Sequence, residues 1–421
     1  QILKKLYPMA AGYGASVDKE MTIISGRVHK DNVNAFTDLL LDAILHPSFS
    51  ADDFKRHQTD VINYLDKTLR YSNDEAFGKE MLYDNMFAGT PYGHPDEGLP
   101  ASVRSITLDD VKNFYKANFT AGNVVVGIGG AFDAALVTRL TTALGTLPPG
   151  APAAVAKPTP KMPVGKEVVL VDKDVKSTAI SIGFPIDLKR GDPDFYALWI
   201  ANSWLGEHRN SSSHLYNVIR EKRGMNYGDY SYIEYYPNGW RRQFPAPNAP
   251  LRQQFFEIWL RPVSNDAAHF ALRAALRELQ KLVDNGMSEE EFNLTRTFVK
   301  KYVKHYAPTT DLRLGYKIDD AFYGISDHLK TAEQMFDKVT LDDVNKAIKK
   351  YLQTSNLRIA MIAKDAATLK QALVTDAPSP MTYATPKPPE VLEEDKVISV
   401  YPLKISANKV TIVPVDSTFM R

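Results

Sequence analysis

The 421-residue sequence contains no cysteine and no excess of charge of either sign. Without cysteine it can form no disulfide, thiolate metal site or cysteine nucleophile, and this absence suits a compartment where stray thiols are a liability. Lysine and arginine number 51 against 50 aspartates and glutamates, so no bulk field attracts nucleic acid or an acidic membrane surface. We therefore expect no nucleic-acid partner and a bacterial periplasmic location.

Long hydrophobic runs are also missing. The longest apolar stretch, around residues 124–132, is far shorter than the roughly 20 residues that a bilayer-spanning helix needs. We expect no membrane span and interpret this stretch as a buried strand. With 44% hydrophobic and 24% charged residues, the chain has the composition of a globular protein of two or three domains.

The sequence contains an internal duplication. Residues 107–111 and 340–344 both read Thr-Leu-Asp-Asp-Val and lie 233 positions apart. Ser50 and Ser288 begin a second matching pair, and each is followed by acidic residues that favour the start of a helix. A period of this size indicates two related globular domains, because solenoid repeats are only about 20 to 50 residues long.

The duplication predicts where the domains lie. We assign residues 1–146 to the first domain, residues 147–163 to a Pro/Ala-rich linker, residues 164–376 to the second domain, and residues 377–421 to a C-terminal extension that opens with a Pro-rich stretch. The second domain begins with a segment, residues 164–214, that has no counterpart in the first. We therefore expect the first domain to lack its opening two strands and helix.

Both copies predict an α+β fold. Residues 22–28 are expected to form a strand, and the residues after them place their apolar side chains on one helical stripe. Residues 123–129 and 357–363 are expected to be the strands that close the two domains. In the extension, residues 397–403 and 409–415 are expected to be short strands. A mixed sheet with long helices packed on one face gives a two-layer α+β domain.

Arg220 and Tyr227 are the candidate binding residues. The sequence around them predicts a helix that ends near Glu221, a turn at Gly224 and a Tyr-rich strand, which brings both residues to one helix-to-strand junction. An arginine fork and a tyrosine hydroxyl are suited to gripping the carbonyls or the carboxylate of a peptide. A structural interpretation also exists, because an arginine at a helix C-terminus suits the helix dipole and a strand tyrosine commonly packs. Spacing alone leaves both interpretations open.

This segment resembles the signature of the pitrilysin, or insulinase, family of zinc peptidases, which are inverzincins. The residues that carry the resemblance are Ser213, Leu215, Arg220, Glu221, Gly224 and Tyr227. The likeness covers nearly all of the chain, including the duplication, the linker and the capped helices. It implies two copies of the metallopeptidase fold of the mitochondrial-processing-peptidase type. It also implies that Arg220 and Tyr227 bind substrate and help to stabilise the reacting carbonyl.

The resemblance does not extend to the metal site. The family binds zinc through H-x-x-E-H on a helix of the first domain and through a glutamate further along the chain. No H-x-x-E-H occurs in this sequence, and the position of the third ligand falls near Asn63, Tyr64 and Leu65, none of which is a carboxylate. We therefore predict no catalytic residue, no metal ligand and no cofactor in this chain.

The resemblance thus implies a non-catalytic, substrate-binding subunit of a bacterial heterodimeric zinc peptidase. A homologous partner chain would carry the zinc, and the substrate would be a peptide or an unfolded segment. Two alternatives stay open. The motif could lie ahead of Gln1, with a ligand such as Glu75 hidden by a misplaced alignment, so that the chain is itself a zinc metalloendopeptidase. Alternatively, the chain is a structural core subunit derived from a peptidase, which the retention of Arg220 and Tyr227 disfavours.

Overall fold

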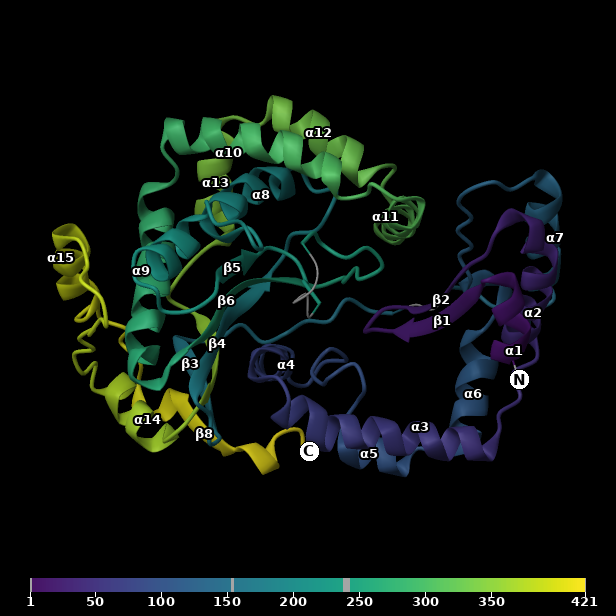
Figure 1. Ribbon diagram of the computed structural model, residues 1–421, viewed down its shortest axis with the longest axis horizontal. Coiled ribbons are helices and arrows are strands. Elements are labelled where there is room, and N and C mark those ends of the chain that lie inside the picture. The colour runs from purple at the N-terminus through teal and green to yellow at the C-terminus, as the bar shows by residue number, and fades with distance from the viewer. Residues whose placement is uncertain (1, 153–154, 238–242, 421) are drawn as a thin grey trace.

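The computed structural model describes residues 2–152, 155–237 and 243–420 (Figure 1). It contains helices and strands in both parallel and antiparallel pairs, which confirms the predicted α+β fold class with a mixed sheet. Most strands gather in one six-stranded sheet, while β1, β2 and several N-terminal helices lie apart from it, at the right of Figure 1. The long helix α3 (Ala51–Asn63) runs between these two parts along the lower edge of the view.

Three parts of the chain are named here by the boundaries that the sequence predicts. The N-terminal region is residues 1–146, the central region is residues 164–376, and the C-terminal extension is residues 377–421. The boundaries themselves stay a prediction from the sequence.

The six-stranded sheet has the strand order β5-β6-β4-β7-β3-β8. Its strands are β3 (Lys166–Asp172), β4 (Ser177–Ile186), β5 (Asp229–Tyr232), β6 (Gln254–Ser264), β7 (Leu357–Ala363) and β8 (Val410–Pro414). β3 is parallel to β7 and to β8, and the other pairs are antiparallel. The strand predicted over residues 357–363 is β7. The strand predicted within residues 409–415 is β8, which brings the C-terminal extension to the edge of the sheet.

The strand expected over residues 397–403 is wrong. Its first two residues belong to a helix, α15 (Pro389–Ile398), and the rest form a turn and irregular chain. Val391 and Ile398 lie seven positions apart on this helix, and both are buried. Because residues seven apart share one helical face, the helical period decides the structure here rather than the short apolar run.

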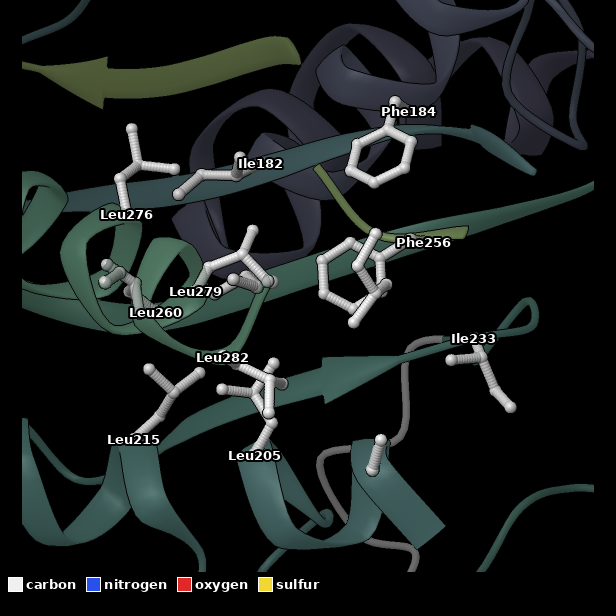
Figure 2. Close-up of a cluster of buried hydrophobic side chains, with 14 of the residues drawn as sticks. Ile182, Phe184, Leu205, Leu215, Ile233, Phe256, Leu260, Leu276, Leu279 and Leu282 are labelled. Carbon is white, nitrogen blue, oxygen red and sulfur yellow. The ribbon is translucent and has the colours of Figure 1, made fainter. Parts of the chain in front are cut away.

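Helices of the central region cover one face of the sheet. The helices that contact its strands are α8 (Pro193–Gly206), α9 (Ala268–Asn285) and α14 (Ala366–Val374). The other helices of this region are α10 (Glu289–Tyr302), α11 (Thr310–Tyr323), α12 (His328–Lys338) and α13 (Leu341–Tyr351). Figure 2 shows Leu276, Leu279 and Leu282 of α9 beside Ile182 and Phe184 of β4 and Phe256 and Leu260 of β6. All of these side chains are buried, and α10, α12 and α13 pack against α8 outside them. This layer matches the predicted packing of helices on one face.

The opposite face of the same sheet is covered by a helix of the N-terminal region. This helix, α4 (Asp74–Met86), packs against β4 and β7 (Figure 1). Phe77 and Leu82 of α4 share a buried hydrophobic cluster with Ala179 of β4 and Ile362 of β7. The central sheet is therefore buried on both faces, and one of its two layers of cover comes from the other end of the chain.

The N-terminal region has a smaller sheet. β1 (Gly12–Val17) and β2 (Thr22–Arg27) form an antiparallel pair, and β2 is the strand predicted over residues 22–28. The other helices here are α1 (Ile2–Leu6), α2 (Val33–Leu45), α5 (Pro100–Ser105), α6 (Leu108–Asn118) and α7 (Ala134–Leu144). The strand expected over residues 123–129 is wrong, because residues 124–129 join no sheet and the structure places no strand of the described chain beside them to share backbone hydrogen bonds.

The duplicated helix starts have the predicted capping geometry. The helices that follow Thr107, Ser288 and Thr340 each begin with a capping box. The capping hydroxyl accepts the backbone N–H of an acidic residue three positions later, and the carboxylate of that residue accepts the backbone N–H of the capping residue. Ser50 caps α3 more simply, since its Oγ accepts a hydrogen bond from the backbone N–H of Asp53 at 3.3 Å. The same short sequence signal therefore starts corresponding helices in both copies.

Candidate functional site

The segment around Arg220 folds as the sequence predicts. A short run of π-helix, η5 (Tyr216–Glu221), leads into a turn at Gly224, and β5 begins at Asp229. Gly224 has φ of +69°, a conformation that glycine adopts without steric cost. Its backbone N–H donates to the carbonyl of Arg220 at 2.7 Å, which closes the end of the helix. Arg220 and Tyr227 therefore lie at one helix-to-strand junction.

Arg220 and Tyr227 are in contact with each other. The guanidinium carbon of Arg220 lies 5.8 Å from the centre of the Tyr227 ring, within the range of a cation–π interaction. Tyr227 is 75% exposed, whereas Tyr230, Tyr232 and Tyr236, which follow it in the chain, are buried. Within the described residues, neither side chain makes a hydrogen bond or an ion pair. Tyr227 thus presents a hydroxyl and an aromatic face to solvent beside the half-buried guanidinium of Arg220.

Arg223, three residues further along, has a purely structural environment. Its side chain is fully buried, and its Nε and Nη2 donate to Asp395 at 2.7 Å and Glu394 at 3.0 Å in α15. Its Nη1 donates to the carbonyl of Val218 at 2.7 Å. Arg223 therefore docks the C-terminal extension, whereas the nearby Arg220 is left without such partners.

A small hydrogen-bond network fixes the loop that carries Tyr227. The side-chain amide of Asn226 donates to Asp229 at 2.7 Å and to the backbone carbonyl of Arg261 at 3.0 Å. Its oxygen accepts the N–H of Gly228 at 3.2 Å. The N–H of Arg261 in turn donates to the carbonyl of Gly228 at 3.1 Å. Tyr227 is thus an exposed ring on a backbone that is held on both sides.

Asp229 is a buried carboxyl group directly behind the site. Its side chain is completely buried, and burial raises its pKa well above the usual value. The hydrogen bond from Asn226 and the charges of Arg220 and Arg261 oppose this rise. The two arginines therefore share one acidic neighbour, which lies at the start of β5 and pairs with Leu260 of β6.

Arg261 links this loop to the N-terminal region. Its Nε and Nη2 lie 3.1 and 3.0 Å from one carboxylate oxygen of Glu75, and its Nε lies 3.3 Å from the other. Burial disfavours the charged form of Arg261, but the hydrogen bonds and charge of Glu75 outweigh it and raise the pKa of Arg261. Glu75 stands in the first turn of α4. Glu75, which the sequence offers as a possible metal ligand, is instead bound by the guanidinium group of Arg261.

The residues near the expected third metal ligand do not fit a zinc site. Asn63 ends α3, and the next two residues, Tyr64 and Leu65, enter a π-helical turn. Leu65 is fully buried in the hydrophobic cluster with Phe77, so its side chain belongs to the core. Over residues 2–152, 155–237 and 243–420, no three histidine, cysteine, aspartate or glutamate side chains come together as a metal-binding group.

The tyrosines of the predicted strand serve packing. Tyr230, Tyr232 and Tyr236 form a buried cluster with Trp259, so these side chains do not line an open groove. His208, just past the end of α8, is also buried, and its Nδ1 lies 2.8 Å from the hydroxyl of Tyr232. Of the two candidate binding residues at the junction, Tyr227 is exposed and Arg220 is half-buried.

Sequence patterns do not identify Asn226, Asp229, Arg261 and Glu75 as neighbours of the site. Glu75 and Arg261, which form the ion pair, are 186 positions apart, and neither lies in a recognisable motif. A hint exists only at Asn226, a short polar residue in the turn before β5, where such side chains bind nearby backbone.

The chain has relatives of known fold. Residues 105–298 match the family model described as the peptidase M16 inactive domain. A crystal structure of a peptidase M16 inactive domain from Pseudomonas fluorescens superposes with a TM-score of 0.75 at 21% identity, over 86% of this chain and 83% of that chain. At this level of identity the superposition shows a shared fold.

Curated relatives point to the same group. A probable mitochondrial-processing peptidase subunit beta from Arabidopsis thaliana is 26% identical over 196 residues, which are 46% of this chain and 36% of that protein. An uncharacterised zinc protease of Mycobacterium tuberculosis is 23% identical over 348 residues, or 82% of this chain and 75% of the relative. A non-peptidase homologue of Helicobacter pylori is 22% identical over 332 residues, or 77% and 71% of the two chains.

The fold and these matches relate the chain to the zinc-protease, or pitrilysin, class of proteins. More particularly, the chain carries the inactive domain of the peptidase M16 family over residues 105–298 and is homologous to the zinc proteases of that family. The resemblance predicted from the sequence is thereby confirmed. In the described part of the chain, no helix combines the length and the apolar character that crossing a bilayer requires.

Proposed function

We propose that this chain is a non-catalytic, peptide-binding subunit of a zinc-dependent peptidase and acts with a homologous, zinc-bearing partner chain. Arg220 and Tyr227 bind the peptide, and the partner's zinc supplies the metal-activated water. The observation that carries the proposal is the contrast at the junction. Tyr227 is exposed, and Arg220 has no ion-pair partner among the described residues. Arg223 beside them is buried and ion-paired.

The family context supports a role without catalysis. The matched family model is that of an inactive domain, and the Helicobacter pylori relative is called a non-peptidase homologue. The plant relative is by name a subunit. Leu65, in the core near the expected ligand position, supplies no group that can bind zinc. The alternative of an autonomous zinc peptidase draws its support from the mycobacterial relative, which is called a zinc protease.

The structural-subunit alternative has its own observation. A chain of complex III2 from Candida albicans superposes with a TM-score of 0.64 at 14% identity, over 84% of this chain and 82% of that chain. That likeness concerns the fold alone. An architectural role gives no reason for an exposed tyrosine and an arginine without an ion-pair partner in the described chain, so the open pair favours peptide binding.

The proposal includes a periplasmic location and a substrate of short peptides or unfolded segments. The location rests on the complete absence of cysteine. The substrate class rests on the two groups of the site, because guanidinium and phenol hydroxyl recognise backbone carbonyls and carboxylates, which every extended peptide offers.

The decisive test is direct binding of a fluorescein-labelled, unstructured peptide, measured by fluorescence anisotropy. Arg220→Ala is expected to weaken binding about tenfold or more, because a hydrogen bond to a charged group contributes about 1.5 to 3 kcal/mol. The matched control is Arg296→Ala. That arginine lies on α10, is half-buried as Arg220 is, donates to Asn293 one turn away at 3.2 Å and lies 4.8 Å from the centre of the Phe292 ring. Its removal makes the same change in net charge and also removes a cation–π contact.

Melting of both variants should equal that of the parent chain, since neither arginine supports the core. If the Arg220→Ala and Arg296→Ala variants bind the peptide with equal affinity, the peptide-binding role of Arg220 is wrong. Purification of the protein from its source provides the test of the partner. We expect a second chain of similar size carrying H-x-x-E-H to accompany it, and hydrolysis by this chain alone would contradict the non-catalytic assignment.

A further inference from the structure

A ladder of polar contacts joins α4 of the N-terminal region to β6 of the central region. Glu75, Lys79 and Tyr83 are spaced four residues apart and therefore share one face of α4. Glu257 and Arg261 are also four apart and share one face of β6. The ammonium of Lys79 lies 3.6 Å from the carboxylate of Glu257, and the hydroxyl of Tyr83 donates to the same carboxylate at 2.8 Å.

The inner part of the ladder fixes the register of the helix on the strand. Lys79 and Glu257 are 3% and 0% exposed at their side chains, so neither charge is solvated by water. Lys79 is satisfied further by the carbonyl of Tyr236 at 2.9 Å and by the ring of Trp259 at 4.9 Å. A buried pair of this kind adds little net stability but penalises any shifted docking, which would leave a charge unpaired.

The outer end of the ladder is the ion pair between Glu75 and Arg261, which lies beside the loop that carries Tyr227. Arg261 binds Glu75 of α4 with its side chain and binds the Tyr227 loop with its backbone, through Gly228 at 3.1 Å and Asn226 at 3.0 Å. The same residue therefore holds both the helix and the loop. The charges of Arg220 and Arg261 both act on the buried carboxyl group of Asp229 and oppose the rise of its pKa.

We propose that Glu75 and Arg261 are positioning residues for the peptide site, so that peptide affinity at Arg220 and Tyr227 depends on the docking of α4 against β6. The inference rests on the proposed function. It gives the N-terminal region a role in binding although Arg220 and Tyr227 both belong to the central region. The ion pair acts through Arg261 on the loop and does not itself touch the peptide.

Glu75→Gln tests this role against a closely matched control, Asp74→Asn. Asp74 occupies the same first turn of α4 and also makes an ion pair across the two regions, to Lys173 after β3. Both changes remove one negative charge from the helix start and one ion pair between the regions. Only Glu75 is bonded to the residue that holds the Tyr227 loop.

Binding of the same labelled peptide is expected to weaken about fivefold in the Glu75→Gln variant and to stay unchanged in the Asp74→Asn variant, at equal melting temperatures. Glu75→Gln combined with Tyr227→Ala should bind no more weakly than Tyr227→Ala alone, because the positioning residue acts through the loop that carries Tyr227. Arg261→Gln should show the same loss as Glu75→Gln, and the double variant should show no further loss.

The outcomes separate the two proposals. If Arg220→Ala weakens binding but the Glu75→Gln variant and its control bind equally, the positioning role is wrong while the proposed function stands. If Arg220→Ala has no effect, the proposed function itself fails. Should Glu75→Gln melt below its control, Glu75→Asp decides, because it keeps the charge on a shorter side chain. Affinity restored toward that of the parent supports the role, and unrestored affinity overturns it.

Discussion

The N-terminal and central regions bury their hydrophobic side chains to very different degrees. Among the described residues, the exposed large hydrophobic side chains of the central region are only Val164, Tyr227 and Leu294. Those of the N-terminal region are Ile2, Leu3, Tyr7, Val17, Ile24, Tyr71, Ile106, Val111, Phe114, Val125, Val126, Phe132 and Val137. The central sheet has helices on both faces, whereas β1 and β2 are solvent-exposed along most of their length.

The helix α4 shows what this difference means. It belongs by sequence to the poorly buried region, yet eight of its thirteen residues are buried because it lies against the central sheet. A two-stranded sheet alone is marginally stable in water, so the N-terminal region gains its hydrophobic burial mainly where it docks on its neighbour. Stability therefore depends on this contact, and the proposed positioning of the peptide site depends on the same contact.

The largest expected effect concerns that contact. Leu82→Ala, in the fully buried face of α4, should lower the free energy of unfolding by about 4 kcal/mol, because it leaves a cavity between α4 and the central sheet. The control is Val125→Ala, at a side chain that is 68% exposed, which should change stability by less than about 0.5 kcal/mol. Urea denaturation measures both. Equal losses of unfolding free energy in the two variants would contradict the difference in side-chain burial between α4 and the exposed part of the N-terminal region.

An intermediate effect is expected from a buried acid of the central region. Burial raises the pKa of Glu207, at the end of α8, to about 7 from a usual value of 4.5. The carboxyl is protonated in both states below pH 4.5, and stability falls as the pH rises from there toward 7, because the unfolded chain releases its proton first. Glu207→Gln should therefore stabilise the protein by roughly 3 kcal/mol above pH 7 and have little effect at pH 4.

Asp60→Asn is the control for this pH dependence, since Asp60 is an exposed carboxyl group on α3 of the N-terminal region. Thermal unfolding at several pH values measures both variants. We expect no pH-dependent gain from Asp60→Asn. A gain of similar size in the two variants would contradict the assignment of the effect to the burial of Glu207.

The smallest expected effect is that of removing metal. Neither region brings three metal-binding side chains together within the described residues, and Leu65 near the expected ligand position is a core residue. Treatment with EDTA should therefore leave the melting temperature unchanged, and elemental analysis of the purified chain should find no stoichiometric zinc. About one zinc per chain would reverse the assignment and favour the zinc-peptidase alternative.

The comparison also shows which elements could be predicted from the sequence. The strands β2 and β7 and the helices capped by Thr107 and Thr340 were predictable because their signals are local. The strand expected over residues 123–129 was predicted from the same kind of apolar run as β7. It failed because β7 has β3 and β4 on its two sides, while residues 124–129 have no strand of the described chain beside them.

The sequence alone determined the duplication, the capped helices and the junction that brings Arg220 to Tyr227. These features depend on residues within a few positions of one another, where short-range sterics and hydrogen bonds decide the conformation. Only the tertiary structure decided that α4 covers the central sheet and that Glu75 meets Arg261, 186 positions away. Burial and ion pairing between distant segments depend on how whole surfaces fit, and no local pattern in a single sequence records that fit.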